Sequence, residues 1–391
     1  MTAASAILFG TSAIFLLLAL HPFVIYPLAL RIMAYLRPAP LLLSVPYGAP
    51  RVAVCVCAYN EERVIGDRIR NILAFRPRFA DLEILIYVDG AADRTADIVR
   101  GFGDAITAVI SDQRLGKTHG MNTLVSMTQA DIVVFSDANV TFAPGAIANL
   151  VAPFADPTVG CVCGHLRYLA GDGHTAETGS LYWRLEEYIK AMESATGSVM
   201  GADGSIFAIR RTLHRPPPPH LIDDMYVSLA IVCAGARVVR AENATAYEAS
   251  VATAREEFRR KVRIACQAFN VHRALWPELR RLNRLDRFKY VSHKLLRWLS
   301  IFSLAAACLL FAAGLAASQV AGVLPTFTIL AAVAAALVAT ARRGPASRLR
   351  EILLALIATG LGVGQSFRGQ QFQTWTPPAS ARAVAKLQAG G

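Results

Sequence analysis

The sequence predicts an α/β domain with a mostly parallel, doubly wound sheet, placed between apolar helices at the two ends of the chain. Two observations predict this fold: short apolar strands alternate with helical patterns through the middle of the chain, and long apolar stretches flank that part. Of the 391 residues, 54% are hydrophobic and 17% are charged, which excludes a disordered chain. The formal net charge of +12 suits nucleic acid, anionic lipid or an anionic substrate equally well.

The first apolar stretch runs from Ile7 to Leu30 and is long enough to cross a bilayer. No basic residue precedes it, whereas Arg31 and Arg37 follow it. This pattern predicts an uncleaved transmembrane helix, kinked near Pro22, and not a signal peptide. Because basic flanks stay in the cytoplasm, the middle of the chain is expected to be cytoplasmic.

Three further apolar stretches, Leu299–Ser318, Val320–Ala341 and Ile352–Gly364, follow the middle part. Counting them as spans gives a multi-pass membrane protein with four spans and a polar tail over 371–391. Between the middle part and these spans, residues 276–298 alternate basic with apolar and aromatic side chains. That alternation is typical of an amphipathic helix on an anionic leaflet, with a solvated helix face as the alternative. Since much of the positive charge lies here, we expect no nucleic-acid partner.

The domain itself is expected over residues 51–275, after a proline-rich linker at 38–50. Buried strands are expected at residues 51–58, 82–88, 105–110 and 131–135. Helical patterns separate these strands, so they should pair in parallel. Ligands bind at the carboxyl ends of the strands in such sheets, and Tyr59, Asp89 and Asp137 lie at these ends.

Two acidic motifs in this domain are candidates for chemistry. Asp137 and Asn139 are two residues apart, so both side-chain oxygens can turn toward one Mg²⁺ or Mn²⁺ ion, although Asp-x-Asn is also ordinary turn chemistry. Asp223 and Asp224 follow a run of four prolines and open an apolar helix. One of this pair is a candidate general base, and the alternative is a helix cap.

Two other segments complete the set of candidates. A glycine-rich turn contains Gly201 and Asp203, just before an apolar strand-like run. A strongly basic run contains Arg260 and Arg263. Their cations could hold a diphosphate, and the alternative is a solvated helix face.

Together these motifs resemble the membrane-bound family 2 glycosyltransferases, which include synthases of cellulose, chitin, hyaluronan and poly-N-acetylglucosamine. The resemblance covers about residues 50–300 and rests on an ordered set of motifs: Ala58-Tyr59-Asn60-Glu61-Glu62, Val88-Asp89-Gly90, Gly116-Lys117 with Asn122, Asp137-Ala138-Asn139, and Asp223-Asp224 with Ser228-Leu229. It implies a GT-A fold and an inverting, metal-dependent transfer of a hexosyl or N-acetylhexosaminyl group. The donor would be a nucleotide sugar, expected to be UDP-linked.

The resemblance also implies a role for each matching residue. Asp224 would deprotonate the acceptor hydroxyl, and Asp137 with Asn139 would bind Mg²⁺ or Mn²⁺. The nucleotide sugar would contact Tyr59, Glu61, Asp89, Lys117, Asp137, Arg260 and Arg263. The acceptor side would be formed by Gly201, Asp203 and Asp223.

The sequence departs from the family pattern in two places. Asn139 stands where the family usually has a second Asp, which keeps an oxygen but loses a charge. The Gln-x-x-Arg-Trp motif of polymerising members corresponds to Arg260-Lys261-Val262-Arg263-Ile264, which lacks the Gln and the Trp. In those synthases the Trp supports the acceptor glycan. We therefore expect single transfer to a glycan or lipid-linked acceptor, in polysaccharide or glycolipid biosynthesis. A processive synthase that also translocates its product is the alternative, while a nucleotidyltransferase on a related sheet and a non-catalytic membrane scaffold rank far behind. Nothing in the sequence supports a protein partner.

Overall fold

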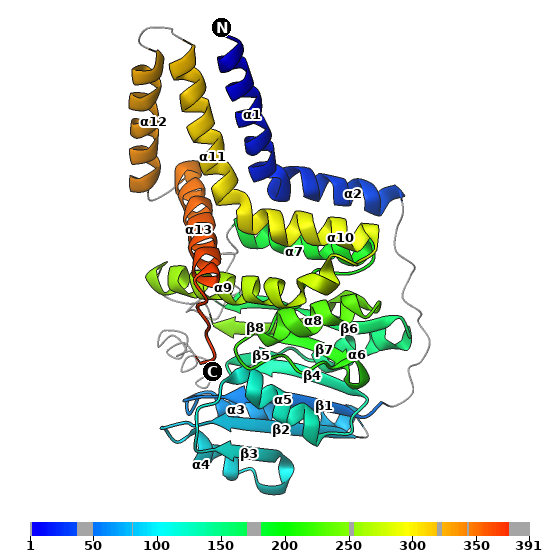
Figure 1. Ribbon diagram of the computed structural model, residues 1–391. Helices are drawn as coiled ribbons and strands as arrows, with labels where there is room; N and C mark the ends of the chain where they lie inside the picture. Colours follow the sequence, from blue (N-terminus) through cyan, green and yellow to red (C-terminus); the bar gives the residue numbers. More distant parts are fainter. Residues whose placement is uncertain are drawn as a thin grey trace.

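The computed structural model describes residues 2–36, 50–79, 81–169, 181–249, 254–318, 323–341 and 344–374. An α/β domain forms one end of the molecule and long helices extend from it (Figure 1). The N-terminus lies at the far end of these helices, and the last described residues run back toward the sheet (Figure 1). Most of the linker expected at 38–50 and most of the tail expected at 371–391 lie outside the described residues.

One sheet of eight strands forms the centre of the domain, in the order β3-β2-β1-β4-β7-β6-β8-β5. The strands are β1 (Val52–Ala58), β2 (Leu82–Asp89), β3 (Thr107–Ser111), β4 (Ile132–Asp137), β5 (Val140–Phe142), β6 (Val159–Leu169), β7 (Ile206–Arg210) and β8 (Arg237–Ala249). The first half is parallel, as predicted: β1 pairs with β2 and β4, and β2 with β3. The second half is mixed, because β7 runs antiparallel to β4 and β6, and β5 antiparallel to β8.

Helices cover both faces of the sheet. One face packs against α3 (Ile65–Leu73), α4 (Thr95–Arg100) and α6 (Ala146–Val151), and the other against α5 (Lys117–Met127), α8 (Asp223–Cys233) and α9 (Ala254–Leu279). Each face of the sheet has its own hydrophobic core, because successive side chains of a strand point to opposite faces. In β1, Val54 and Val56 belong to the core on the side of α3, while Ala53 and Cys55 belong to the core on the side of α8. The α/β prediction is therefore confirmed, with helices on both sides.

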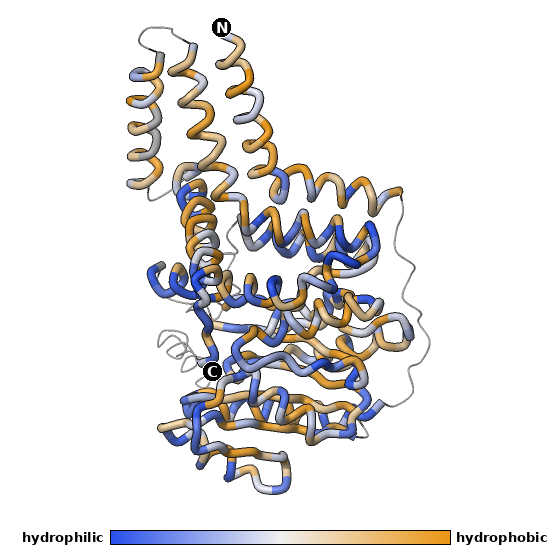
Figure 2. Tube along the Cα trace, in the orientation of Figure 1, coloured by the Kyte–Doolittle hydropathy of each residue, from blue (hydrophilic) through white to orange (hydrophobic). Residues whose placement is uncertain are grey.

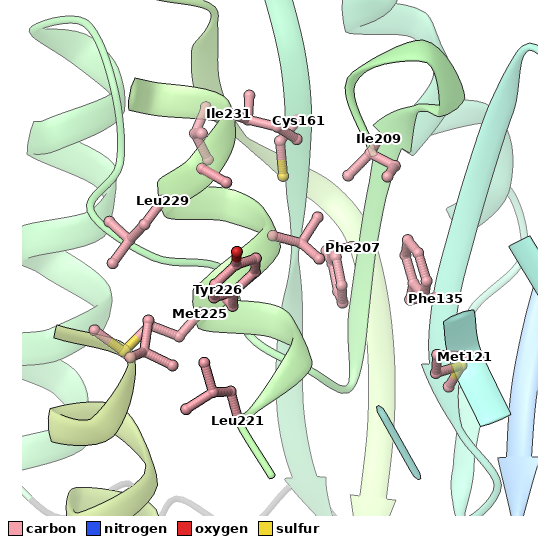
Figure 3. Close-up of a cluster of buried hydrophobic side chains, with 14 of the residues drawn as sticks. Met121, Phe135, Cys161, Phe207, Ile209, Leu221, Met225, Tyr226, Leu229 and Ile231 are labelled. Carbon is pink, nitrogen blue, oxygen red and sulfur yellow. The ribbon is translucent and has the colours of Figure 1, made fainter. Parts of the chain in front are cut away.

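The core under α8 fixes this helix against the middle of the sheet (Figure 3). Phe135 of β4 and Phe207 of β7 stack with their ring centroids 4.7 Å apart. Met225, Tyr226 and Leu229 of α8 belong to the same buried cluster. Because this apolar packing holds α8, the position of the acidic residues in its first turn is also fixed.

The N-terminal helix bends where the sequence predicts. α1 (Ala3–Leu20) leads into a π-helical turn around Pro22 and then into α2 (Tyr26–Leu36). The bend turns the chain so far that α2 runs in a different direction from α1 and lies alongside the helices that cover the domain (Figure 1). Tyr26 and Leu30 are fully buried and pack against Ile189 of α7 (Leu181–Ala195). The end of the predicted span therefore packs on protein.

The C-terminal part consists of α10 (Arg284–Tyr290), a π-helical turn (Val291–Leu295), α11 (Leu296–Ala317), α12 (Val323–Thr340) and α13 (Gly344–Phe367). Within the part of the chain that the structure describes, two helical stretches are long and apolar enough to cross a membrane: Ala3–Leu36 and Arg284–Ala317. Figure 2 shows the apolar colouring of α1 and α11. A crossing by α12 stays a prediction.

The stretch Ile352–Gly364 lies in α13, which is not one of these two stretches, and a crossing there also stays a prediction. One side of α13 packs on α9. A Cβ atom added at Gly362 would lie 2.4 Å from the carbonyl oxygen of Val262, and the Arg273 guanidinium donates to the carbonyl of Ser366 at 2.7 Å. One face of this stretch therefore packs on protein, while Leu354, Ile357 and Leu361 are exposed.

The segment 276–298, predicted to lie on a membrane surface, is exposed in its first part, at Arg280 and Arg287, and its contact with a leaflet stays a prediction. Further along, Lys289 and Trp298 are buried. The Lys289 ammonium donates to the carbonyl oxygen of Glu193 at 3.0 Å. This second part therefore packs between helices of the protein.

Replacing Gly362 by Val tests the contact between α13 and α9. The added side chain overpacks this contact, so we expect a loss of about 1–3 kcal/mol in the free energy of unfolding. The measurement is the melting temperature of the purified protein in detergent. Gly364→Val is the matched control, because a Cβ atom at Gly364 meets nothing within 4 Å. Equal melting temperatures for the two variants would contradict this packing.

Candidate active site

One cavity of about 2120 Å³ lies at the carboxyl ends of β1, β2 and β4 and extends to α9, α11 and α13. The structure brings every predicted site residue to this cavity: Tyr59, Glu61, Asp89, Lys117, Asp137, Asn139, Gly201, Asp203, Asp223, Asp224, Arg260 and Arg263. Their meeting follows from the parallel half of the sheet, whose strand ends share one edge. The individual roles remain predictions.

The centre of the cavity is an ion-paired cluster around Lys117, the first residue of α5. Its ammonium lies 2.7 Å from Oδ1 of Asp137 and 3.6 Å from Oδ2 of Asp223. Burial alone lowers the pKa of Lys117, but the carboxylates around it raise that pKa well above its usual value. Lys117 is therefore a cation, and it ties the end of β4 to the start of α8.

Asp224 lies next to this cluster, in the first turn of α8. Burial, then the charge of Asp223, raise the pKa of Asp224 to about 7, while Lys117 opposes the rise. Gly204 lies against the carboxylate: a Cβ atom there would be 2.7 Å from Oδ2 of Asp224. A carboxylate with a pKa near neutrality is suited to take a proton from a hydroxyl group.

Asp137 and Asn139 lie together at the end of β4, as the motif predicts. Oδ2 of Asp137 accepts a hydrogen bond of 3.4 Å from the Ser205 hydroxyl. The Asn139 amide donates to Oε1 of Glu248 at 3.0 Å. Burial raises the pKa of Glu248 to about 7. The sequence analysis missed Glu248, because no local motif in β8 marks it.

These side chains offer oxygen atoms, which are the ligands that Mg²⁺ and Mn²⁺ prefer. Within the described ranges, no group of three or more His, Cys, Asp and Glu side chains forms a ready-made metal cage. The set of Asp137 and Asn139 therefore fits a divalent ion that takes further oxygens from a bound ligand.

Near the ends of β1 and β2, the Arg114 guanidinium stacks over the ring of Tyr59, 3.7 Å from its centroid. Arg114 belongs to the loop before α5 and was not predicted. Asp89 is 3% exposed, and its carboxylate accepts the backbone N–H groups of Leu115 (2.7 Å) and Gly116 (3.0 Å). Asp89 thus holds this loop in place, and its contact with a nucleoside stays a prediction.

The basic wall of the cavity is formed by α9. Arg260 and Arg263 are three residues apart and so share one face of the helix. Burial lowers the pKa of Arg260, but the nearby Tyr168 and Glu248 raise it by more than burial lowers it. The pKa of Arg260 is therefore above its usual value. Burial lowers the pKa of Arg263 to about 10, and its guanidinium donates to Gln267 at 3.2 Å.

At its other end the cavity is mostly apolar, apart from charged side chains near the start of α13. Ile301 and Phe302 of α11 and Ile357 and Leu361 of α13 line this part. Phe302 is 49% exposed and Leu361 is 52% exposed, so the apolar walls also reach the molecular surface. One continuous cavity thus joins the acidic cluster to the apolar helices.

Comparison with known proteins identifies the domain. The sequence model described as "Glycosyltransferase like family 2" matches residues 50–267, more than half of the chain. An N-acetylglucosaminyltransferase of Rhizobium meliloti is 24% identical over 265 residues, which are 63% of this chain and 62% of that protein. A beta-monoglucosyldiacylglycerol synthase of Synechocystis is 32% identical over 145 residues, 34% of this chain and 30% of that protein. The chain thus spans less than two thirds of the length of these relatives.

A solved structure shares the fold, including the helical part. The mannosyltransferase PcManGT from Pyrobaculum calidifontis, in complex with GDP-Man and Mn²⁺, superposes with a TM-score of 0.73 at 22% sequence identity. The match covers 93% of this chain and 99% of that one. With the family match over most of the α/β domain, it confirms the GT-A fold. This chain belongs to glycosyltransferase family 2.

Proposed function

We propose that this protein is an inverting, divalent-metal-dependent glycosyltransferase that acts at a membrane. It moves a hexosyl or N-acetylhexosaminyl group from a nucleotide sugar, expected to be UDP-linked, to a hydroxyl group of a lipid-linked or glycan acceptor. The observation that carries this proposal is one cavity in which Asp224 lies beside the Lys117 cluster and whose other end is lined by apolar side chains of α11 and α13.

In this reaction Asp224 takes the proton of the acceptor hydroxyl while the acceptor oxygen forms its bond to the anomeric carbon. The bond from that carbon to the diphosphate breaks, and its electron pair leaves with the diphosphate. Attack from the face opposite the leaving group inverts the anomeric centre. Lys117, Arg260 and Arg263 line the cavity and would offset the charge of the leaving diphosphate.

Asp137 and Asn139 would hold the divalent ion. When bound, this ion neutralises charge on the diphosphate and so makes it a better leaving group. The Mn²⁺ and GDP-Man in the PcManGT complex support this assignment. Asp137 is available for it because its carboxylate reaches the cavity, 30% of its side chain being exposed.

For the acceptor, the apolar end of the cavity favours an amphiphile whose apolar part lies near α11 and α13. The name of the Synechocystis relative, a diacylglycerol glycolipid synthase, supports an acceptor of this kind. One observation favours the second candidate, a processive polysaccharide synthase: Trp298 lines the cavity. An indole there could support a glycan, although Ile264 stands where polymerising members carry their Trp.

The experiment that tests the proposal measures nucleoside diphosphate release from a panel of nucleotide sugars by the detergent-purified protein with Mn²⁺ or Mg²⁺. A lipid extract or oligosaccharides serve as acceptors, and the products are sized. One sugar per acceptor supports the proposal, whereas a polymer without added acceptor supports the processive synthase. An absence of release from every nucleotide sugar with every acceptor would contradict both.

Replacing Asp224 by Asn removes the base and retains the shape of the side chain. We expect the transfer rate to fall about 10²–10⁴-fold, which is the usual contribution of a general base. Binding of nucleoside diphosphate, measured by calorimetric titration, should be retained, because the base acts on the acceptor. A matching loss of nucleotide binding would show that Asp224 belongs to the donor site.

The pH dependence of kcat/KM tests the same role. Because the carboxylate of Asp224 must be deprotonated to accept a proton, activity should rise with pH and level off above about pH 7. The measurement is kcat/KM across the neutral range at saturating metal concentration. A level profile through neutral pH would contradict this prediction.

Replacing Gly204 by Ala tests the geometry around the base. The added methyl group would press on Oδ2 of Asp224, and displacement of a reacting group by about 1 Å costs on the order of 10²-fold in rate. Initial transfer rates and melting temperatures measured in parallel separate this effect from misfolding. Gly66→Ala is the control, since a Cβ atom there meets its neighbours at an ordinary 3.5 Å. Wild-type rates for Gly204→Ala would contradict the close approach.

A further inference from the structure

The acidic motif at the end of β4 lacks a charge that a divalent ion would use. Asp137 carries a carboxylate, but Asn139, two residues on, carries a neutral amide. One carboxylate with one amide oxygen is a weak ligand set for Mg²⁺ or Mn²⁺. The affinity of a site for these ions depends on the charge of its oxygen ligands. The fold places another acid next to this position.

That acid is Glu248, near the end of β8. β5 starts directly after Asn139 and pairs antiparallel with β8, so that Val140 is the partner of Glu248. This pairing carries the Glu248 side chain to the Asn139 amide, which donates to its Oε1 at 3.0 Å. Residues more than a hundred positions apart in the sequence thus form one group of oxygens.

The carboxylate of Glu248 is not fully used by the protein. Glu248 is 8% exposed and lines the cavity. Its Oε2 is buried and accepts no hydrogen bond from any residue that the structure describes. A buried carboxylate oxygen without a partner is costly, and a ligand that binds there would compensate this cost.

A purely structural role explains less of this arrangement. The hydrogen bond from Asn139 requires only one acceptor oxygen, which Gln would provide equally well. Arg260 is near enough to lower the pKa of Glu248, yet it does not hydrogen-bond to the free oxygen. The charge of Glu248 thus interacts with Arg260, but its second oxygen has no hydrogen-bond partner among the described residues.

We propose that Glu248 is a ligand of the divalent metal ion and supplies the carboxylate that Asn139 lacks. Together with Asp137 it gives the site two negative charges, as a second Asp in the β4 motif would. This inference rests on the proposed function, because it assumes that a divalent ion binds with the nucleotide. It assigns the metal site to two strands, β4 and β8, instead of to one motif.

The test measures Mn²⁺ binding in the presence of UDP and, in parallel, of GDP. The electron paramagnetic resonance signal of free Mn²⁺ is the readout. Glu248→Gln retains the hydrogen bond but loses the charge, and we expect Mn²⁺ affinity to fall about 10–100-fold. Asn139→Asp in the Glu248→Gln background should restore most of that affinity. Glu257→Gln is the matched control, because Glu257 lies on the same cavity, is 38% exposed and pairs with Lys261.

The outcomes separate this inference from the proposed function. Wild-type Mn²⁺ affinity in Glu248→Gln, or a loss that Asn139→Asp does not restore, overturns the role of Glu248 and leaves the glycosyltransferase proposal standing. A wild-type protein that binds neither nucleotide with Mn²⁺ overturns the metal dependence itself. Melting temperatures of all variants identify any loss that comes from misfolding.

Discussion

The ion pairs of Lys117 with Asp137 and Asp223 are the interaction on which the site depends. Each carboxylate comes from a different element, the end of β4 and the first turn of α8. Two neighbouring carboxylates in a partly buried site repel each other unless a cation lies between them. With Lys117 in that position, α8 can present Asp224 beside the end of β4, at the edge of the sheet where ligands bind.

The same constraint explains why the site is poised for a charged ligand. A nucleotide diphosphate and a divalent ion bring opposite charges to a cluster that already contains both signs. Lys117 and the arginines of α9 suit the diphosphate, while Asp137 and Glu248 suit the ion. The apolar end of the cavity is formed separately, between α11 and α13, and α13 packs closely on α9 through Gly362. The two halves meet in one cavity, which fits a soluble donor and an acceptor held at a membrane.

Much of the fold and site could be predicted, because strands and their ends are local signals. The apolar runs that form β1, β2 and β4 and the polar residues after them lead directly to Asp89 and Asp137. Glu248 could not be found this way, since its place depends on the pairing of β8 with β5, which no local pattern encodes. Composition alone likewise does not decide whether Ile352–Gly364 crosses a membrane, since a helix that packs on protein and one that faces lipid share the same apolar composition. The mixed half of the sheet likewise depends on long-range pairing.

The most direct test of this account is the position of a metal ion bound with nucleotide. Anomalous scattering from crystals grown with Mn²⁺ and UDP, or Mn²⁺ and GDP, locates the ion without assumptions about the donor sugar. The account predicts one peak in the cavity beside Asp137, with the diphosphate next to it and Asp224 facing the part that leads to α11 and α13. Nucleotide bound outside this cavity, or Mn²⁺ bound away from Asp137, would contradict it.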